Sequence, residues 1–183
     1  MNVFVLNSGR CGSLTFAQAC QHVTNYSSGH ETKVQGLGNI RIEYPKNHIE
    51  SDCRLAYFLG RLDAQYGKEA FYVHLRRNQK DSIASWENRL GPRCIINAHA
   101  IGVLMFYQFT SDHIARKKFI VDYMRSIEEN ILLFLKDKPL QMDFDLEHAE
   151  DHFNVFWERI EAQGDKAAAL AEWSIKYNAS VEA

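Results

Sequence analysis

Two short runs of consecutive apolar residues are the clearest pattern along the chain. Val3–Leu6 and Ala70–Leu75 are rich in β-branched and aromatic side chains, which is typical of strands buried on both faces of a parallel sheet. Leu140–Phe144 alternates apolar and polar residues and predicts a third strand. Two weaker segments, Thr32–Val34 and Ile40–Tyr44, are interpreted as short strands, and Thr24–Gly29 as a polar turn.

Apolar residues spaced three and four positions apart predict helices between and after these strands. The predicted helices are Leu14–Cys20, Ser51–Tyr66, Asp81–Arg89, Asn97–Leu135, Glu147–Ala162 and Asp165–Tyr177. Ser13 and Asn78 are candidate N-caps, and Gly67 is a candidate helix end. We expect Asn97–Leu135 to form two helices, or one helix with a break near Thr110 and Ser111.

The order of these elements predicts an α/β protein with a three-layer architecture, a parallel sheet flanked by helices, and a helix-rich C-terminal half. Residues 1–183 carry no internal repeat and no low-complexity linker, so we expect one domain. The chain is 46% hydrophobic and 24% charged. This composition can build a core and excludes wholesale disorder.

Charge, hydropathy and cysteine content indicate which classes of partner and which cellular compartment to expect. Lys and Arg total 21 against 23 Asp and Glu, a net charge of −2, so we expect no nucleic-acid partner. No apolar stretch approaches the roughly 18 residues of a membrane span, so we expect no membrane partner. The four cysteines show no C-x-x-C pair, and Met1–Leu6 is too short for a signal-peptide core. We therefore expect a reducing, cytoplasmic setting.

The loop after the first strand is the first candidate site. It joins a strand to a helix, so its backbone N–H groups and the positive end of the helix can hold a phosphate or sulfate. The residues concerned are Ser8, Gly9, Arg10, Cys11, Gly12, Ser13, Leu14 and Thr15. The Gly-Lys-Ser/Thr ending of a Walker loop is absent, which argues against an ordinary ATPase or GTPase. The alternative is a tight turn that binds nothing.

A second cationic segment follows the strand at Ala70–Leu75. Arg76, Arg77 and Lys80 come directly after its carboxyl end, the edge of a parallel sheet where ligands bind. Ser85 lies eight residues after Arg77, on the next predicted helix. Together with the first loop, these residues predict two anion sites for one ligand, although most Arg-Arg pairs lie in solvated turns.

Arg10-Cys11-Gly12-Ser13 resembles the 5′-phosphosulfate loop of PAPS-dependent sulfotransferases, and Arg77 through Ser85 is similar to their 3′-phosphate segment. The match covers roughly residues 1–90 and suggests a short, bacterial-type member. The resemblance implies a P-loop NTPase-like sulfotransferase fold and the co-substrate PAPS (3′-phosphoadenylyl sulfate), with PAP as its product and no metal. Arg10, Gly12, Ser13 and Thr15 would hold the 5′ end of PAPS, and Arg77 and Ser85 the 3′-phosphate.

The resemblance also implies a general base. Glu31 is similar to the acidic residue that activates the acceptor hydroxyl in tyrosylprotein and carbohydrate sulfotransferases, while His30 is the rival base. Arg10 would polarise the phosphosulfate. The chain departs from the family in several features: it is shorter, Leu14 stands where a second Ser or Thr is common, Gln79 stands where a proline is common, and no glycine-rich basic segment follows Asp145.

The sequence therefore predicts a sulfotransferase that acts on a hydroxyl of an unidentified small-molecule or carbohydrate acceptor. The alternatives are a nucleotide or small-molecule kinase of P-loop architecture and a non-catalytic nucleotide-binding module. His148 and His152 are four residues apart on a predicted helix, but no third metal ligand is evident, so we expect no metal site.

Overall fold

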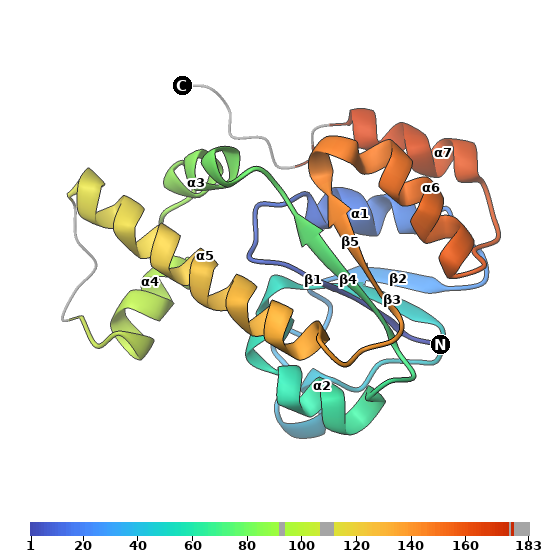
Figure 1. Cartoon of the computed structure of the whole chain (residues 1–183), viewed down its shortest axis with the longest axis horizontal. Helices are drawn as coiled ribbons and strands as arrows, with labels where there is room; N and C mark the ends of the chain where they lie inside the picture. Colours follow the sequence, from blue (N-terminus) through green and yellow to red (C-terminus); the bar gives the residue numbers. More distant parts are fainter. Residues whose placement is uncertain (92–93, 107–111, 176, 178–183) are drawn as a thin grey trace.

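The computed structural model describes residues 1–91, 94–106, 112–175 and 177. Its centre is a five-stranded sheet in the order β2-β3-β1-β4-β5, in which all paired neighbours are parallel (Figure 1). The strands are β1 (Val3–Leu6), β2 (Ser27–His30), β3 (His48–Ser51), β4 (Phe71–Arg76) and β5 (Gln141–Asp145). The register pairs Leu6 of β1 with His74 of β4.

Helices cover both faces of the sheet (Figure 1). They are α1 (Ser13–Cys20), α2 (Leu59–Tyr66), α3 (Gln79–Glu87), α4 (Ile95–Ala98), α5 (His113–Leu135), α6 (Ala149–Arg159) and α7 (Lys166–Ala171). Short 3-10 turns occupy Gly38–Arg41, Cys53–Tyr57, Leu146–His148 and Glu172–Ser174, and a π-helical turn occupies His99–Val103. None of the helices in the described ranges is long and apolar enough to span a membrane.

Alternate residues of β1 pack into two separate hydrophobic cores, one on each face of the sheet, because successive side chains of a strand point to opposite faces. Val3 and Val5 pack with side chains of α1, α6 and α7, including Phe16. Phe4 and Leu6 pack with side chains of α2, α3, α4 and α5. The predicted α/β architecture with helices on both sides of a parallel sheet is therefore confirmed.

The segments with strong apolar patterns form the elements that the sequence predicts. Val3–Leu6, Ala70–Leu75 and Leu140–Phe144 correspond to β1, β4 and β5. Asn78 caps α3 through a bond from the Lys80 N–H, and Gly67, with φ 51°, ends α2. On the core-facing side of α5, Ile120, Tyr123, Met124, Ile127 and Ile131 are buried.

The polar segment between residues 24 and 51 differs from its prediction. The predicted turn at Thr24–Gly29 contains most of β2, whereas Thr32–Val34 and Ile40–Tyr44 form no strand. Arg41 lies in a 3-10 turn and is buried against Asp52 instead of facing solvent. Side-chain hydrogen bonds, and not an apolar pattern, decide the structure of this region.

Two helix predictions need correction, and a third falls partly outside the described residues. Ser51–Tyr66 divides into the end of β3, a 3-10 turn and α2. Asp165–Tyr177 ends as α7 at Ala171 and continues in a 3-10 turn. Asn97–Leu135 spans the end of α4, the π-helical turn at His99–Val103 and α5, and the predicted break at Thr110 and Ser111 lies outside the described residues.

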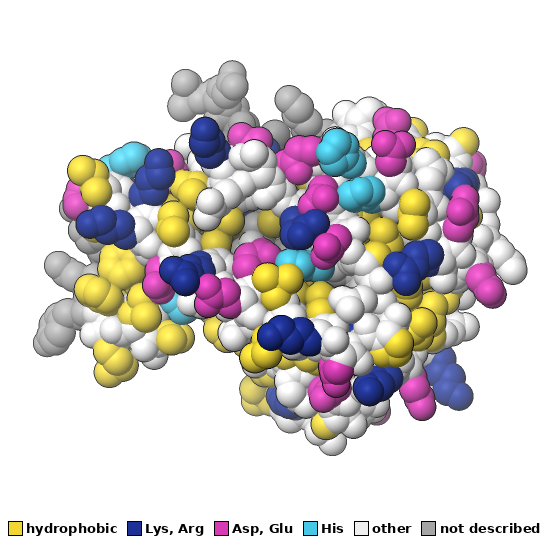
Figure 2. Space-filling view, in the orientation of Figure 1, with side chains coloured by type: hydrophobic (Ala, Val, Ile, Leu, Met, Phe, Trp, Pro, Cys, Tyr) yellow, Lys and Arg dark blue, Asp and Glu magenta, His cyan; other side chains and the backbone are white. Residues whose placement is uncertain are grey.

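The strand order creates a crevice at the carboxyl ends of β1 and β4. The connection that leaves β1 runs toward β2 and β3, whereas the connection that leaves β4 runs toward β5 on the other side. Ligands of open parallel sheets bind at such a change of direction. Figure 2 shows acidic and basic side chains interspersed over the visible face, in keeping with the near-neutral net charge.

Candidate functional site

A pocket of about 710 Å³ opens at the carboxyl ends of β1 and β4. Both predicted anion-binding segments line it. The lining residues that the sequence predicts are Gly9, Arg10, Gly12, Ser13, Leu14, Thr15, His30, Glu31, Arg77 and Ser85. Ser8 and Cys11 belong to the same loop but are buried beneath it. The volume lies within the range of small-molecule sites.

The loop between β1 and α1 depends on left-handed backbone at Gly9 (φ 84°), Arg10 (φ 59°) and Gly12 (φ 86°). Gly12, and not the predicted Ser13, is the N-cap of α1, and no side chain caps the helix. The N–H groups of Ser13 and its two successors lie in the first helical turn, where no helical carbonyl can accept from them. These donors face a site suited to an anion.

Internal hydrogen bonds hold this loop in shape before any ligand binds. The Gly9 N–H donates to Asn7 Oδ1 at 2.9 Å, and the Cys11 thiol donates to the Gly9 carbonyl at 3.1 Å. Burial raises the pKa of Cys11 to about 11, so the thiol stays neutral near pH 7. Cys11 therefore supports the loop as a hydrogen-bond donor and does not act as a nucleophile.

The two predicted segments meet at Arg10. Arg10 Nε donates to Ser85 Oγ at 2.9 Å, and Arg77 donates to the Arg10 carbonyl at 3.3 Å. These residues are far apart in sequence but follow the adjacent strands β1 and β4 or lie on α3. The Arg10 guanidinium therefore contacts the second anion-binding segment (Arg77–Ser85), although the Arg10 backbone belongs to the first, the loop after β1.

Cations gather in this part of the pocket. The pKa of Arg10 is lowered, first by burial and then by repulsion from Arg89 and Arg77. All three side chains line the pocket. Arg89 was absent from the sequence prediction; it lies in the turn that follows α3, four residues after Ser85. Guanidinium groups that repel one another favour a multivalent anion between them.

The two candidate bases lie at the carboxyl end of β2. His30 Nε2 is 3.1 Å from Ser13 Oγ, at the start of α1. Glu31 follows with φ 54°, and its carboxylate is 2.6 Å from the Arg54 guanidinium. His30, Glu31 and Arg54 all line the pocket. Arg54 was absent from the sequence prediction, since it falls within a segment interpreted as one amphipathic helix.

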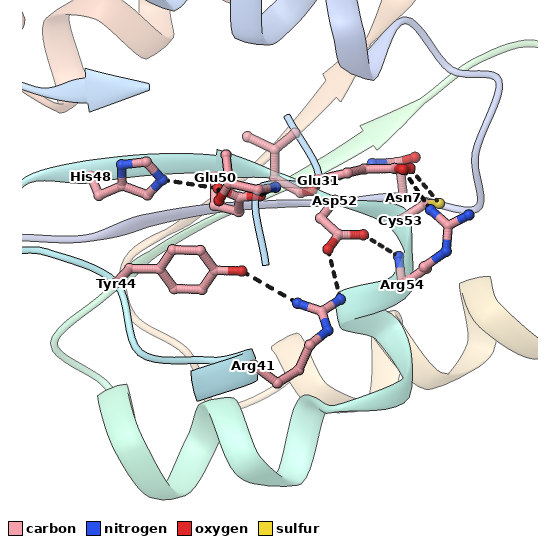
Figure 3. A network of polar contacts seen from close by, with 11 residues as sticks. Asn7, Glu31, Arg41, Tyr44, His48, Glu50, Asp52, Cys53 and Arg54 are labelled. Atoms are coloured by element: carbon pink, nitrogen blue, oxygen red, sulfur yellow. Dashed lines mark hydrogen bonds and ion pairs between the residues drawn. The ribbon is translucent and has the colours of Figure 1, made fainter. Parts of the chain in front are cut away.

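Carboxylate and thiol groups also gather behind Glu31, as Figure 3 shows. Potential metal-ligand atoms of Glu31, Asp52 and Cys53 lie within 4.8 Å of one another. However, Arg54 pairs with Glu31, Arg41 pairs with Asp52, and burial raises the pKa of Cys53 far above its usual value. These groups are arranged for ion pairs with arginine, and the set does not fit a metal ion.

The C-terminal part of the chain supplies an aromatic and aliphatic wall. Leu146, Trp173, Ile175 and Tyr177 line the pocket. Trp173 stacks on Phe144 with ring centroids 5.2 Å apart. The Trp173 indole packs on the core and also contributes to the pocket.

A scan against protein-family models matches no family, and a search of curated proteins finds no match. The geometry of the pocket is therefore the basis for a functional proposal.

Proposed function

We propose that this protein transfers a sulfuryl group from 3′-phosphoadenylyl sulfate to a hydroxyl group of an acceptor. The observation that carries the proposal is the convergence of two anion-binding elements in one pocket. The uncapped N-terminus of α1 supplies backbone donors, and Arg10, Arg77 and Arg89 supply positive charge. A nucleotide with separate 3′ and 5′ anionic groups matches this arrangement.

The residues divide between the two ends of such a nucleotide. Arg77, Ser85 and Arg89 would bind the 3′-phosphate, whose charge of −1.5 to −2 suits several guanidinium groups. Backbone N–H groups from Gly12 to Thr15, with the Ser13 and Thr15 hydroxyls, would bind the 5′-phosphosulfate. Arg10 links the two ends, because its backbone belongs to the loop and its side chain contacts Ser85.

The chemistry requires few groups. In an in-line transfer, the acceptor oxygen forms a bond to sulfur while the bond between sulfur and the phosphate oxygen breaks. PAP leaves, and a base accepts the hydroxyl proton. Glu31 is our first candidate for that base, since it lies on the pocket wall next to His30, which contacts the α1 N-terminus. Donors at the helix N-terminus would stabilise charge on the leaving oxygen.

Nucleotide titration tests the binding part of the proposal. By isothermal calorimetry we expect adenosine 3′,5′-bisphosphate to bind more tightly than 5′-AMP or ATP. Arg77→Ala should weaken bisphosphate binding roughly tenfold to hundredfold, since hydrogen bonds to charged groups contribute about 1.5–3 kcal/mol, and should leave 5′-AMP nearly unchanged. Arg125→Ala is the control, because Arg125 is an exposed arginine paired with Glu129. Equal losses for both nucleotides would contradict the assigned 3′-phosphate site.

Transfer assays with labelled PAPS and a panel of hydroxyl acceptors test the chemistry. Glu31→Gln should keep bisphosphate affinity and abolish sulfuryl transfer. His30→Asn should keep part of the transfer activity. The reverse result would make His30 the base. Tight binding of the bisphosphate without transfer to any acceptor would favour a non-catalytic binding module. Preference for ATP would favour a kinase.

A further inference from the structure

Glu31 lies at a turn whose backbone is held from two sides. Its N–H donates to the Ser51 carbonyl of β3 at 3.1 Å, and its φ is 54°. The next residue, Thr32, donates both its N–H and its hydroxyl to the two carboxylate oxygens of Glu50, at 2.7 and 2.6 Å. Glu50 is fully buried. The main chain at Glu31 is therefore fixed, but these bonds do not fix its side chain.

Arg54 holds the side chain. Its guanidinium lies 2.6 Å from Glu31 Oε2, and both side chains are about one-third exposed. On the other side of the carboxylate, the Cys53 thiol donates to Oε1 at 3.7 Å. Each oxygen of Glu31 thus has its own partner, and both partners come from the turn that follows β3 (Figure 3).

The turn that carries Arg54 is itself anchored in the protein interior. Asp52 Oδ1 accepts from the Arg54 N–H at 2.8 Å, and Oδ2 accepts from Arg41 at 2.6 Å. The Arg41 and Asp52 side chains are 3% and 0% exposed. A buried carboxylate with both oxygens paired in this way keeps the backbone of Arg54 in one place.

We infer that Arg54 is a positioning residue that aims the Glu31 carboxylate at the acceptor hydroxyl. This inference rests on the proposed function, in which Glu31 takes the hydroxyl proton. Arg54 acts through Glu31 alone and is distinct from the Arg10, Arg77 and Arg89 group that serves the nucleotide. The pair is too exposed to contribute much to folding, so its removal should change catalysis and leave the fold intact.

The first test compares Arg54→Ala, Arg54→Lys and the control Arg125→Ala, which breaks another arginine–glutamate pair. Arg54→Ala should lower kcat about a hundredfold, the size expected when a catalytic group is misplaced by about 1 Å. Its bisphosphate affinity and its KM for PAPS should stay within about threefold of wild type. Arg54→Lys should restore part of kcat. Guanidinium ion added to the buffer should raise kcat of Arg54→Ala and leave the control unchanged.

A second measurement does not need catalysis. In nitrogen-15 NMR spectra, hindered rotation of the Arg54 guanidinium should resolve its Nη signals in wild type and not in Glu31→Gln. If wild type binds no bisphosphate and transfers no sulfuryl group, the proposed function is wrong, and the NMR spectra still report whether Arg54 pairs with Glu31. Wild-type kcat in Arg54→Ala, or identical Arg54 signals with and without the Glu31 carboxylate, would overturn the positioning role. Loss of both kcat and bisphosphate affinity, without rescue by guanidinium, would also overturn it.

Discussion

Replacing Gly9 with alanine should destabilise the protein strongly, because the loop after β1 leaves no room for a side chain there. A Cβ at Gly9 would lie 2.5 Å from Cζ2 and 3.3 Å from Cη2 of the Trp86 ring. The backbone φ of 84° adds a second penalty, since left-handed backbone costs an L-residue about 1–2 kcal/mol. Displacing a buried indole costs about 1–3 kcal/mol more. We expect a total loss of about 2–5 kcal/mol.

Urea unfolding and thermal melting measure this loss. For a chain of this size each kcal/mol lowers Tm by about 2–4 °C, so Gly9→Ala should melt about 4–20 °C below wild type. The control is Gly60→Ala in α2, where a Cβ would meet no heavy atom within 4 Å. Alanine there should stabilise the helix by about 0.5–1 kcal/mol.

A double-mutant cycle separates the two causes. Trp86→Leu removes the ring, so in its background Gly9→Ala should keep only the backbone penalty of about 1–2 kcal/mol. Bisphosphate affinity should fall along with stability in Gly9→Ala, because Trp86 and Ser85 are neighbours on α3. Wild-type stability in Gly9→Ala, or an equal loss with and without the indole, would refute the reasoning.

The other predictions concern buried charge, thiols and salt. Arg41→Met should destabilise the fold by about 3–5 kcal/mol at pH 7, because it leaves the Asp52 carboxylate buried without its cation. Burial already raises the pKa of Asp52 against the opposing effect of Arg41, and the substitution raises it further. The folded variant then binds a proton as the pH falls through this raised pKa, so urea unfolding should show a smaller loss at pH 4.5 than at pH 7. An equal loss at both values would contradict this account. Cys11, Cys20 and Cys53 are buried, and their thiol pKa values are raised. Mass spectrometry should therefore find these three thiols unmodified by iodoacetamide at pH 8 in the folded protein and alkylated in urea. Rapid alkylation of the folded protein would show that the thiols are accessible to solvent and would contradict their burial. Bisphosphate affinity should fall steadily as salt rises, since guanidinium–phosphate attraction is screened, and calorimetry that shows no salt dependence would place the ligand away from the arginines.

The strands of the sheet centre were predictable because burial on both faces demands apolar runs. β1 and β4 consist almost entirely of such residues, and their neighbouring loops gave the anion-binding segments in the right order. Adjacent parallel strands bring the loops at their carboxyl ends together. The meeting of Arg10 with Ser85 therefore follows from a pattern that is visible in the sequence, once the strand order is known.

β2 and β3 were missed for the opposite reason. Their sequences, Ser-Ser-Gly-His and His-Ile-Glu-Ser, carry almost no apolar signal. The polar side chains of β3 can be buried because they form hydrogen bonds with one another and with a neighbour. The His48 ring lies 2.9 Å from the Glu50 carboxylate, which also accepts from the Thr32 hydroxyl. Such pairing depends on tertiary contacts and leaves no periodicity to detect. Arg54 was not predicted as a site residue for the same reason, because its position depends on the 3-10 turn that follows β3.

Pairing of Leu6 with His74 brings together residues 68 positions apart. Contacts this distant form late in folding, since a long crossover must close first. The complete pocket therefore exists only in the folded chain, and a ligand that bridges Arg10 and Arg77 cannot bind the unfolded state with the same strength. By mass action, such a ligand at a hundred times its Kd stabilises the folded state by about 2.7 kcal/mol. Occupancy of the pocket would thus control how long the chain survives proteases, which cleave it when it unfolds.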